Sequence, residues 1–139
     1  MRILFTGGGT GGHVFPIIAV IRELKKAAEE ERIANLELYY MGPEDFGRGM
    51  LLQEGVTLVP IASGKIRSYF SFSYITDFLK VIVGLCQALW NIFLLMPDVI
   101  FSKGGYGAFP SVLSGIIFRI PLIIHESDSI PGKVNSFSA

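Results

Sequence analysis

With 139 residues, half of them hydrophobic, the chain is long enough to form one domain with a well-buried core. Lys plus Arg and Asp plus Glu number 12 each, so the overall charge excludes a general attraction to nucleic acid or to an anionic membrane, and we expect no nucleic-acid partner. The single cysteine, Cys86, excludes an internal disulfide. The residues before Gly7 lack the apolar run of a signal peptide, which predicts a cytoplasmic location.

Two apolar segments, 81–96 and 108–124, could be mistaken for membrane spans. The first contains Gln87, and the second is interrupted by Arg119 and Pro121. Both are therefore shorter than the roughly 20 uninterrupted apolar residues that a span requires. We expect both segments to form helices of a soluble domain.

Short apolar runs alternate with segments of helical pattern along the whole chain. The runs that predict strands are 3–5, 36–41, 57–59, 99–101 and 122–125. The segments that predict helices are 15–31, 47–54, 74–96 and 108–118. This alternation predicts an α/β, Rossmann-like fold with a mostly parallel sheet and flanking helices. Functional residues of such a sheet gather at the carboxyl ends of its strands.

A glycine-rich loop follows the first predicted strand and opens the first helix, with five glycines in the six positions 7–12. Backbone N–H groups and the positive end of the helix dipole converge there, which favours a phosphate. Gly7, Gly9 and Gly12 satisfy G-x-G-x-x-G, but Met-Gly-Pro at 41–43 replaces the acidic residue of a dinucleotide site, and the lysine of a P-loop is absent. The alternative is a tight turn that binds nothing.

His13 stands directly after this loop, at the start of the predicted helix. The positive helix end favours the neutral imidazole, which is the form that a general base needs. His13 is therefore our candidate catalytic base. The alternative is that the ring only caps the helix and packs.

A second glycine turn follows the fourth predicted strand, with the sequence Ser-Lys-Gly-Gly-Tyr at 102–106. Because it lies at the same edge of the sheet, the two glycine loops could together hold a diphosphate, with Lys103 as a nearby cation. The alternative is another tight turn, in which Tyr106 covers the surface.

The segment after the fifth predicted strand is dense in polar residues. His125, Glu126, Asp128 and Asn135 place a histidine, two acids and an amide at the same sheet edge, which suggests a ligand site. The alternative is structural, with His125 at the strand end and Asp128 or Ser129 capping the next helix.

The predicted helix 74–96 is apolar around most of its circumference. Its least apolar residues are spaced 3, 4, 3 and 4 and form one narrow stripe: Asp77, Lys80, Gly84, Gln87 and Asn91. The remaining arc is wider than a helix needs to cover a sheet. It either packs on the helix 108–118 or enters a membrane interface. The second interpretation uses Ile75, Phe78, Leu79 and Trp90, with Lys65 and Arg67 as basic anchors.

Three motifs resemble the amino-terminal domain of the MurG family, glycosyltransferase family 28. They are Gly-Gly-Thr-Gly-Gly-His-Val-Phe-Pro at 8–16, Gly104-Gly105-Tyr106 with Pro110, and His125-Glu126 through Ile130-Pro131-Gly132 with Asn135. The resemblance runs from Arg2 to Ala139 in the same order and spacing. It implies the amino-terminal half of a GT-B glycosyltransferase that transfers GlcNAc from UDP-GlcNAc to lipid I, forming lipid II in peptidoglycan synthesis. The resemblance further implies inversion at the anomeric carbon and no metal or other cofactor.

The resemblance also implies a role for each matching residue. His13 would be the catalytic residue. The donor would contact Thr10, Gly11, Gly12 and Asp128, and the acceptor diphosphate would contact Gly8, Gly9, Gly104, Gly105 and Tyr106. The other cleft residues would be His125, Glu126 and Asn135. Asp128 stands where the family has asparagine. Since a carboxylate only accepts hydrogen bonds, this departure removes a hydrogen-bond donor from the site. Residues 45–50 likewise lack the glutamate of the family after the second strand.

The implied partners are UDP-GlcNAc, undecaprenyl-linked lipid I, the inner face of the cytoplasmic membrane and a carboxyl-terminal donor domain. Residues 1–139 match only the amino-terminal, acceptor-binding domain, so we expect them to be inactive alone. Two alternatives remain: a nucleotide-binding Rossmann module without transferase chemistry, and one subunit of a split glycolipid GlcNAc transferase.

Overall fold

The computed structural model describes residues 1–8, 10–43, 47–62, 73–126 and 136, and for 73–79 the backbone alone. Its five strands form one sheet in the order β3-β2-β1-β4-β5, and all four pairings are parallel. The strands are β1 (Arg2–Thr6), β2 (Glu37–Gly42), β3 (Thr57–Pro60), β4 (Val99–Ser102) and β5 (Leu122–Ile124). The predicted strands and the parallel, Rossmann-like sheet are confirmed.

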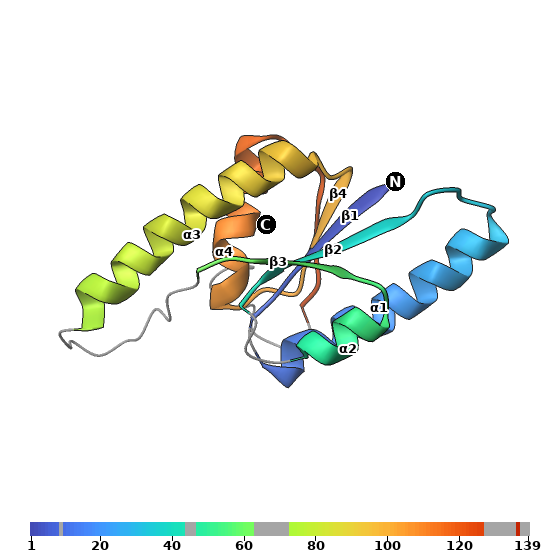
Figure 1. The fold of residues 1–139 in the computed structure, drawn as a ribbon, viewed down its shortest axis with the longest axis horizontal. Helices are drawn as coiled ribbons and strands as arrows, with labels where there is room; N and C mark the ends of the chain where they lie inside the picture. The colour runs from blue at the N-terminus through green and yellow to red at the C-terminus, as the bar shows by residue number, and fades with distance from the viewer. Residues whose placement is uncertain (9, 44–46, 63–72, 127–135, 137–139) are drawn as a thin grey trace.

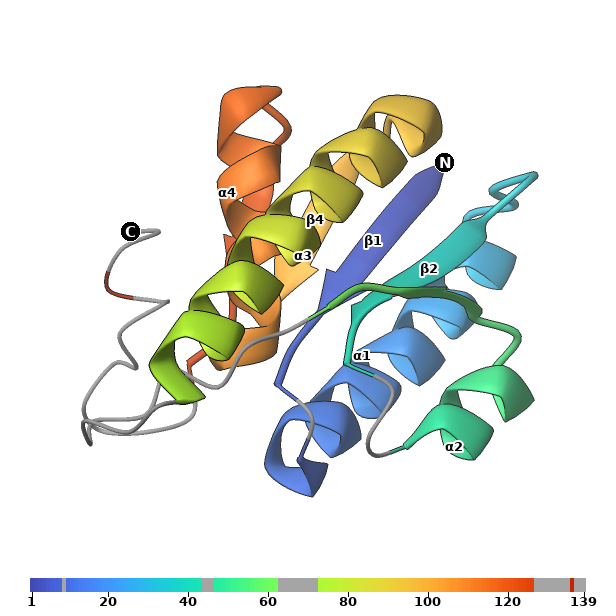
Figure 2. The same ribbon diagram turned by 60° about the vertical axis from the view of Figure 1, so that its left-hand side comes forward.

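Two helices cover each face of the sheet (Figures 1 and 2). On one face lie α1 (Gly11–Glu30) and α2 (Arg48–Gln53), and on the other lie α3 (Ser73–Leu95) and α4 (Phe109–Ile117). A short 3₁₀ helix, η1 (Tyr106–Ala108), precedes α4. All four predicted helices are confirmed in type and place.

The largest difference from the prediction is the start of α1, which begins at Gly11 and not at residue 15. Glycine has a weak helix propensity, and proline is most common in the first turn, so the sequence around Pro16 favours a later start. In the structure Pro16 lies in the second turn of α1. Gly11 and Gly12 are therefore part of the helix, and their N–H groups belong to its first turn.

Strand β1 lies at the centre of the sheet and is buried on both faces, as expected for a parallel sheet. Ile3 and Phe5 pack with α1 in one core, whereas Leu4 packs in the second core with Ala88 and Ile92 of α3. The two cores hold the sheet between its helix layers, so the carboxyl ends of the strands have fixed positions.

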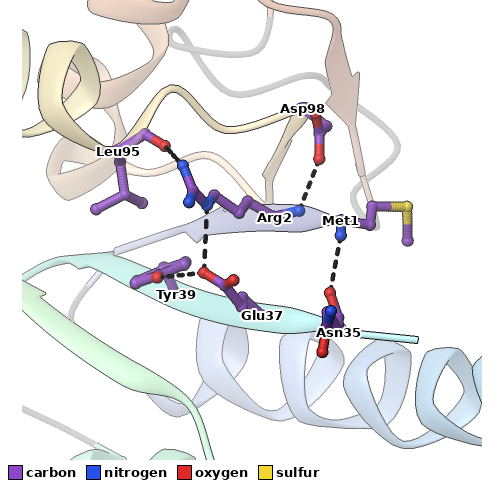
Figure 3. A network of polar contacts seen from close by, with 7 residues as sticks. All are labelled: Met1, Arg2, Asn35, Glu37, Tyr39, Leu95 and Asp98. Carbon is purple, nitrogen blue, oxygen red and sulfur yellow. Dashed lines mark hydrogen bonds and ion pairs between the residues drawn. The ribbon is translucent and has the colours of Figure 1, made fainter. Parts of the chain in front are cut away.

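A polar network closes the amino edge of the sheet, at the opposite end from the glycine loops (Figure 3). The Arg2 backbone N–H donates to Asp98 (2.7 Å), and its side chain donates to Glu37 (3.2 Å) and to the Leu95 carbonyl at the end of α3 (3.0 Å). The Tyr39 hydroxyl also donates to Glu37, at 2.8 Å. That hydrogen bond and the Arg2 charge lower the pKa of Glu37, while the Glu37 carboxylate raises the pKa of Tyr39.

Candidate functional site

The two glycine loops meet around the imidazole of His13. A methyl group added to Gly105 would lie 2.8 Å from His13 Nε2 and 3.0 Å from the Cα of Gly8. One added to Gly8 would lie 3.0 Å from His13 Nδ1. Gly105 also has a φ of +85°, which favours glycine. The ring therefore occupies the space that side chains at these two positions would fill, and the structure brings together three of the predicted site residues.

The residues after β2 and those of η1 pack closely against the first glycine loop. A methyl group on Gly107 would lie 2.5 Å from Pro43 and 2.8 Å from the Gly7 carbonyl oxygen, so only glycine allows this approach. The Tyr40 hydroxyl donates to the same Gly7 carbonyl at 3.4 Å. Gly107 and Pro43 were absent from our predicted site. The signal for Pro43 was the Met-Gly-Pro run at 41–43, which we interpreted only as the absence of the acidic residue of a dinucleotide site.

Thr10 is the N-cap residue of α1, with the extended backbone of a cap, yet its side chain does not cap the helix. Its Oγ1 lies 2.7 Å from His13 Nδ1, while the His13 backbone N–H donates to the Thr10 carbonyl at 3.0 Å. The N–H groups of Gly11 and Gly12, in the first turn, have no acceptor within the helix. The positive end of α1 is thus suited to an anion.

The second glycine loop contains a buried lysine. Lys103 is only 5% exposed, and its backbone N–H donates to the Thr6 carbonyl at 3.0 Å. Gly104 donates its N–H to Ser102 Oγ at 3.2 Å, and Tyr106 is half-buried at the start of η1. The corner between β1 and β4 thus contains a buried lysine beside the second glycine loop.

The segment after β5 contributes two described residues to this edge. The backbone N–H of His125 donates to the Ser102 carbonyl at 2.8 Å, and its ring centroid lies 6.0 Å from that of Phe101. His125 and Glu126 are both half-buried. The other predicted residues there, Asp128 and Asn135, lie outside the described residues, as does Gly9. In the described part of the chain, no group of three or more His, Cys, Asp or Glu residues could hold a metal ion.

The solvent side of α3 is apolar. Ala88 and Ile92 face the sheet, and Phe93 contacts Phe118 at the end of α4 with ring centroids 6.3 Å apart. The helix nevertheless exposes a row of side chains, which we call the apolar face: Ile82, Val83, Cys86, Trp90, Phe93 and Leu94. Packing on α4 therefore accounts for only part of the wide apolar arc.

The predicted membrane patch overlaps this apolar face at one residue. Trp90 is 64% exposed. Ile75, Phe78 and Leu79 belong to the part of α3 with only a described backbone, and Lys65 and Arg67 lie outside the described residues. In the described ranges, no helix combines the length and the apolar character needed to cross a bilayer.

The parallel sheet, its two helix layers and the loops at its carboxyl edge define the chain as a Rossmann-like α/β domain. The solved structure of MurG from Acinetobacter baumannii superposes on it with a TM-score of 0.76, covering 99% of this chain and 38% of that chain at 23% identity, which shows a shared fold. The model of the glycosyltransferase family 28 N-terminal domain matches residues 3–139. The chain belongs to this family.

Two curated relatives extend the comparison over nearly the whole chain. Each is named UDP-N-acetylglucosamine–N-acetylmuramyl-(pentapeptide) pyrophosphoryl-undecaprenol N-acetylglucosamine transferase. The Clostridium botulinum relative is 41% identical over 138 residues, which is 99% of this chain, and the Borrelia turicatae relative is 39% identical over 140 residues, which is 97% of it. The chain spans 37% of the length of either relative.

Proposed function

We propose that the chain is the acceptor-binding domain of an enzyme that transfers GlcNAc from UDP-GlcNAc to the C4 hydroxyl of the N-acetylmuramic acid of lipid I, with inversion. The observation that carries this proposal is the 41% identity, over 99% of the chain, to a transferase named for that reaction. The meeting of two glycine loops around one histidine supports it, because the reaction brings two diphosphates and a hydroxyl group to one place.

In this proposal the acceptor hydroxyl attacks the anomeric carbon of the donor, and UDP leaves. His13 takes the hydroxyl proton, and the N–H groups at the start of α1 stabilise the negative charge of the donor diphosphate. The donor contacts are Thr10, Gly11, Gly12 and Asp128. The acceptor diphosphate contacts Gly8, Gly9, Gly104, Gly105 and Tyr106, and the cleft is completed by His125, Glu126 and Asn135.

A donor-binding domain outside these 139 residues completes the active site in this proposal. The chain covers little more than a third of the length of its relatives, and its carboxyl edge carries loops suited to anions. UDP-GlcNAc would then bind between the two halves, with most of its contacts on the second.

The proposal is tested by incubating the complete gene product with labelled UDP-GlcNAc and lipid I. We expect labelled lipid II, and we expect the variant His13→Ala to lower kcat by about 10²-fold or more, as loss of a general base does. Failure of the wild-type protein to transfer GlcNAc to lipid I would reject the assignment. Near-normal turnover of His13→Ala would reduce His13 to a structural residue.

We further propose that the apolar face of α3 contacts the inner face of the cytoplasmic membrane, where the undecaprenyl chain of lipid I is anchored. The support is chemical: this face exposes Trp90, Phe93 and Leu94, at 64%, 56% and 60%, which is costly in water. Ile116 and Ile117 of α4 are exposed as well. An aromatic and aliphatic surface of this kind favours the boundary between headgroups and acyl chains.

A further inference from the structure

We infer that Thr10 is a positioning residue whose hydroxyl group fixes the orientation and the tautomer of His13, and that an anionic oxygen at the start of α1 selects the tautomer able to act as a base. The inference rests on the proposed function, because it concerns the same cleft. It adds a role for Thr10 besides contact with the donor.

The first observation is an absent capping bond. An N-cap threonine ordinarily accepts a hydrogen bond from a backbone N–H two or three residues ahead. Thr10 has the cap backbone, with φ −128° and ψ 158°, but makes no such bond. Its hydroxyl lies instead 2.7 Å from Nδ1 of the residue that it would have capped, His13. The side chain therefore contacts the imidazole in place of the helix end.

The second observation is that the ring is confined on its other side. Gly8 and Gly105 pack so closely that a methyl group on either would lie 3.0 Å or less from an imidazole nitrogen. With Nδ1 held by Thr10, Nε2 is the nitrogen that lies toward Gly105. Nε2 is thus directed to the second glycine loop, where the acceptor binds in the proposed function.

The hydrogen bond between Thr10 and His13 can run in two directions, with opposite consequences. If the hydroxyl donates to Nδ1, the single ring hydrogen of neutral His13 is on Nε2, which then cannot take a proton. If Nδ1–H donates to Oγ1, Nε2 carries a lone pair and can act as a base. The direction of this bond therefore decides whether Nε2 of neutral His13 can accept a proton.

An anionic oxygen at the start of α1 decides that direction. A phosphate oxygen held by the N–H groups of Gly11 and Gly12 only accepts hydrogen bonds, so it takes the single hydroxyl hydrogen of Thr10. Oγ1 must then accept from Nδ1–H. Donor binding in this way prepares Nε2 to take the proton of the acceptor hydroxyl as its oxygen bonds to the anomeric carbon and the bond to UDP breaks. The imidazolium keeps its Nδ1–H bond to Thr10 and later releases the new proton to solvent.

The decisive experiment measures the tautomer of His13 by ¹⁵N-histidine NMR on the complete gene product, with UDP as the probe. At about pH 8 an ordinary imidazole is neutral, and the variant His13→Gln identifies the His13 signals. We expect UDP to shift His13 to the Nδ1–H tautomer in the wild type and not in Thr10→Val. An identical tautomer in wild type and Thr10→Val, both without and with UDP, would overturn the inference whether or not the protein transfers GlcNAc.

Kinetics and stability give a second readout. We expect Thr10→Val to lower kcat by about 10-fold or more, Thr10→Ser to restore most of it, and the surface variant Thr57→Val to leave it unchanged. Because the hydroxyl does not cap α1, the urea midpoint of Thr10→Val should fall by no more than the loss of one exposed hydrogen bond, that to His13, accounts for. A lower midpoint with normal kcat would show that Thr10 is only a helix cap. Loss of transfer to lipid I in the wild type, with the tautomer shift intact, would reject the proposed function and not this inference.

Discussion

Two buried serines in α4 differ in whether the side-chain hydroxyl group makes a hydrogen bond. Both are fully buried, and Ser114 Oγ donates to the Pro110 carbonyl at 2.7 Å. The hydroxyl oxygen of Ser111 has no hydrogen-bond partner among the described residues. A buried hydroxyl without a partner costs free energy, whereas a bonded one contributes about 0.5–1.5 kcal/mol. Removal of the two hydroxyl groups should therefore change the free energy of unfolding in opposite directions.

We expect Ser111→Ala to leave the free energy of unfolding unchanged or to raise it by up to about 1 kcal/mol, and Ser114→Ala to lower it by a similar amount. Both changes gain the same helix propensity, so the difference between the variants isolates the hydrogen bond. Urea unfolding of the two variants and the wild type measures it. A loss in Ser111→Ala as large as in Ser114→Ala would contradict the prediction.

At the scale of single residues, the sequence predicts the type of the site residues better than their contacts. His13 is identifiable because it follows five glycines at a strand end. Its contact with Thr10 was also open to prediction, since the two residues have the spacing of a capping box. The approach of Gly107 to Pro43 was not, because it depends on how two loops that are far apart in sequence pack together.

At the scale of elements, the network at the amino edge predicts a pH dependence of stability. The pKa of Glu37 is lowered from its ordinary value of 4.5, so its carboxylate stabilises the fold at higher pH, and this contribution is lost as pH falls through the lowered pKa. The pKa of Tyr39 is raised above 10.0, so the hydrogen bond from its neutral hydroxyl is lost as pH rises through that raised value.

We expect Glu37→Gln to be less stable than wild type at about pH 7, and the gap to narrow at about pH 3, because the Glu37 carboxylate takes up protons as the pH falls toward its lowered pKa. The effect is small because the group is exposed and screened by salt. Urea midpoints at both pH values and low ionic strength measure it. The matched control is Glu23→Gln, which removes an exposed ion pair with Lys26 (2.7 Å) and should show little change at either pH. A gap of the same size at both pH values would contradict the prediction.

Strands and helices were predictable because their signals are local, and the orientation of α3 was not. Alternating or continuous apolar runs locate all five strands within two residues of their observed bounds. The sequence did not determine which side of α3 faces outward. In the structure Gly84, in the polar stripe, is buried, and a methyl group there would strike the Ala62 carbonyl. Gln87 accepts a hydrogen bond from the Ala62 N–H at 2.8 Å. Residues 61–62, after β3, thus pack along one side of α3, and the apolar face remains exposed to solvent.

At the scale of the whole molecule, the apolar face has a length and direction that bear on membrane contact. It runs from residue 82 to residue 94, or about 18 Å at 1.5 Å per residue, so a bilayer that covered it would lie along α3. Helix α3 runs from the carboxyl edge of the sheet back to Arg2 at the amino edge. The bilayer surface would therefore run parallel to the line from the carboxyl edge of the sheet to its amino edge.

We expect the apolar face to bind vesicles that contain anionic lipid, and the chain supplies its own probe, because Trp90 is its only tryptophan. Its emission should shift to the blue and be quenched by brominated lipid. Phe93→Ser combined with Leu94→Ser removes about 2 kcal/mol of apolar contact, which should weaken partitioning by about 30-fold. The control Leu52→Ser changes a leucine of similar exposure, at 51%, in α2 on the opposite face of the sheet, and should bind normally. Unchanged Trp90 emission, or equal binding by both variants, would mean that protein and not lipid covers this face.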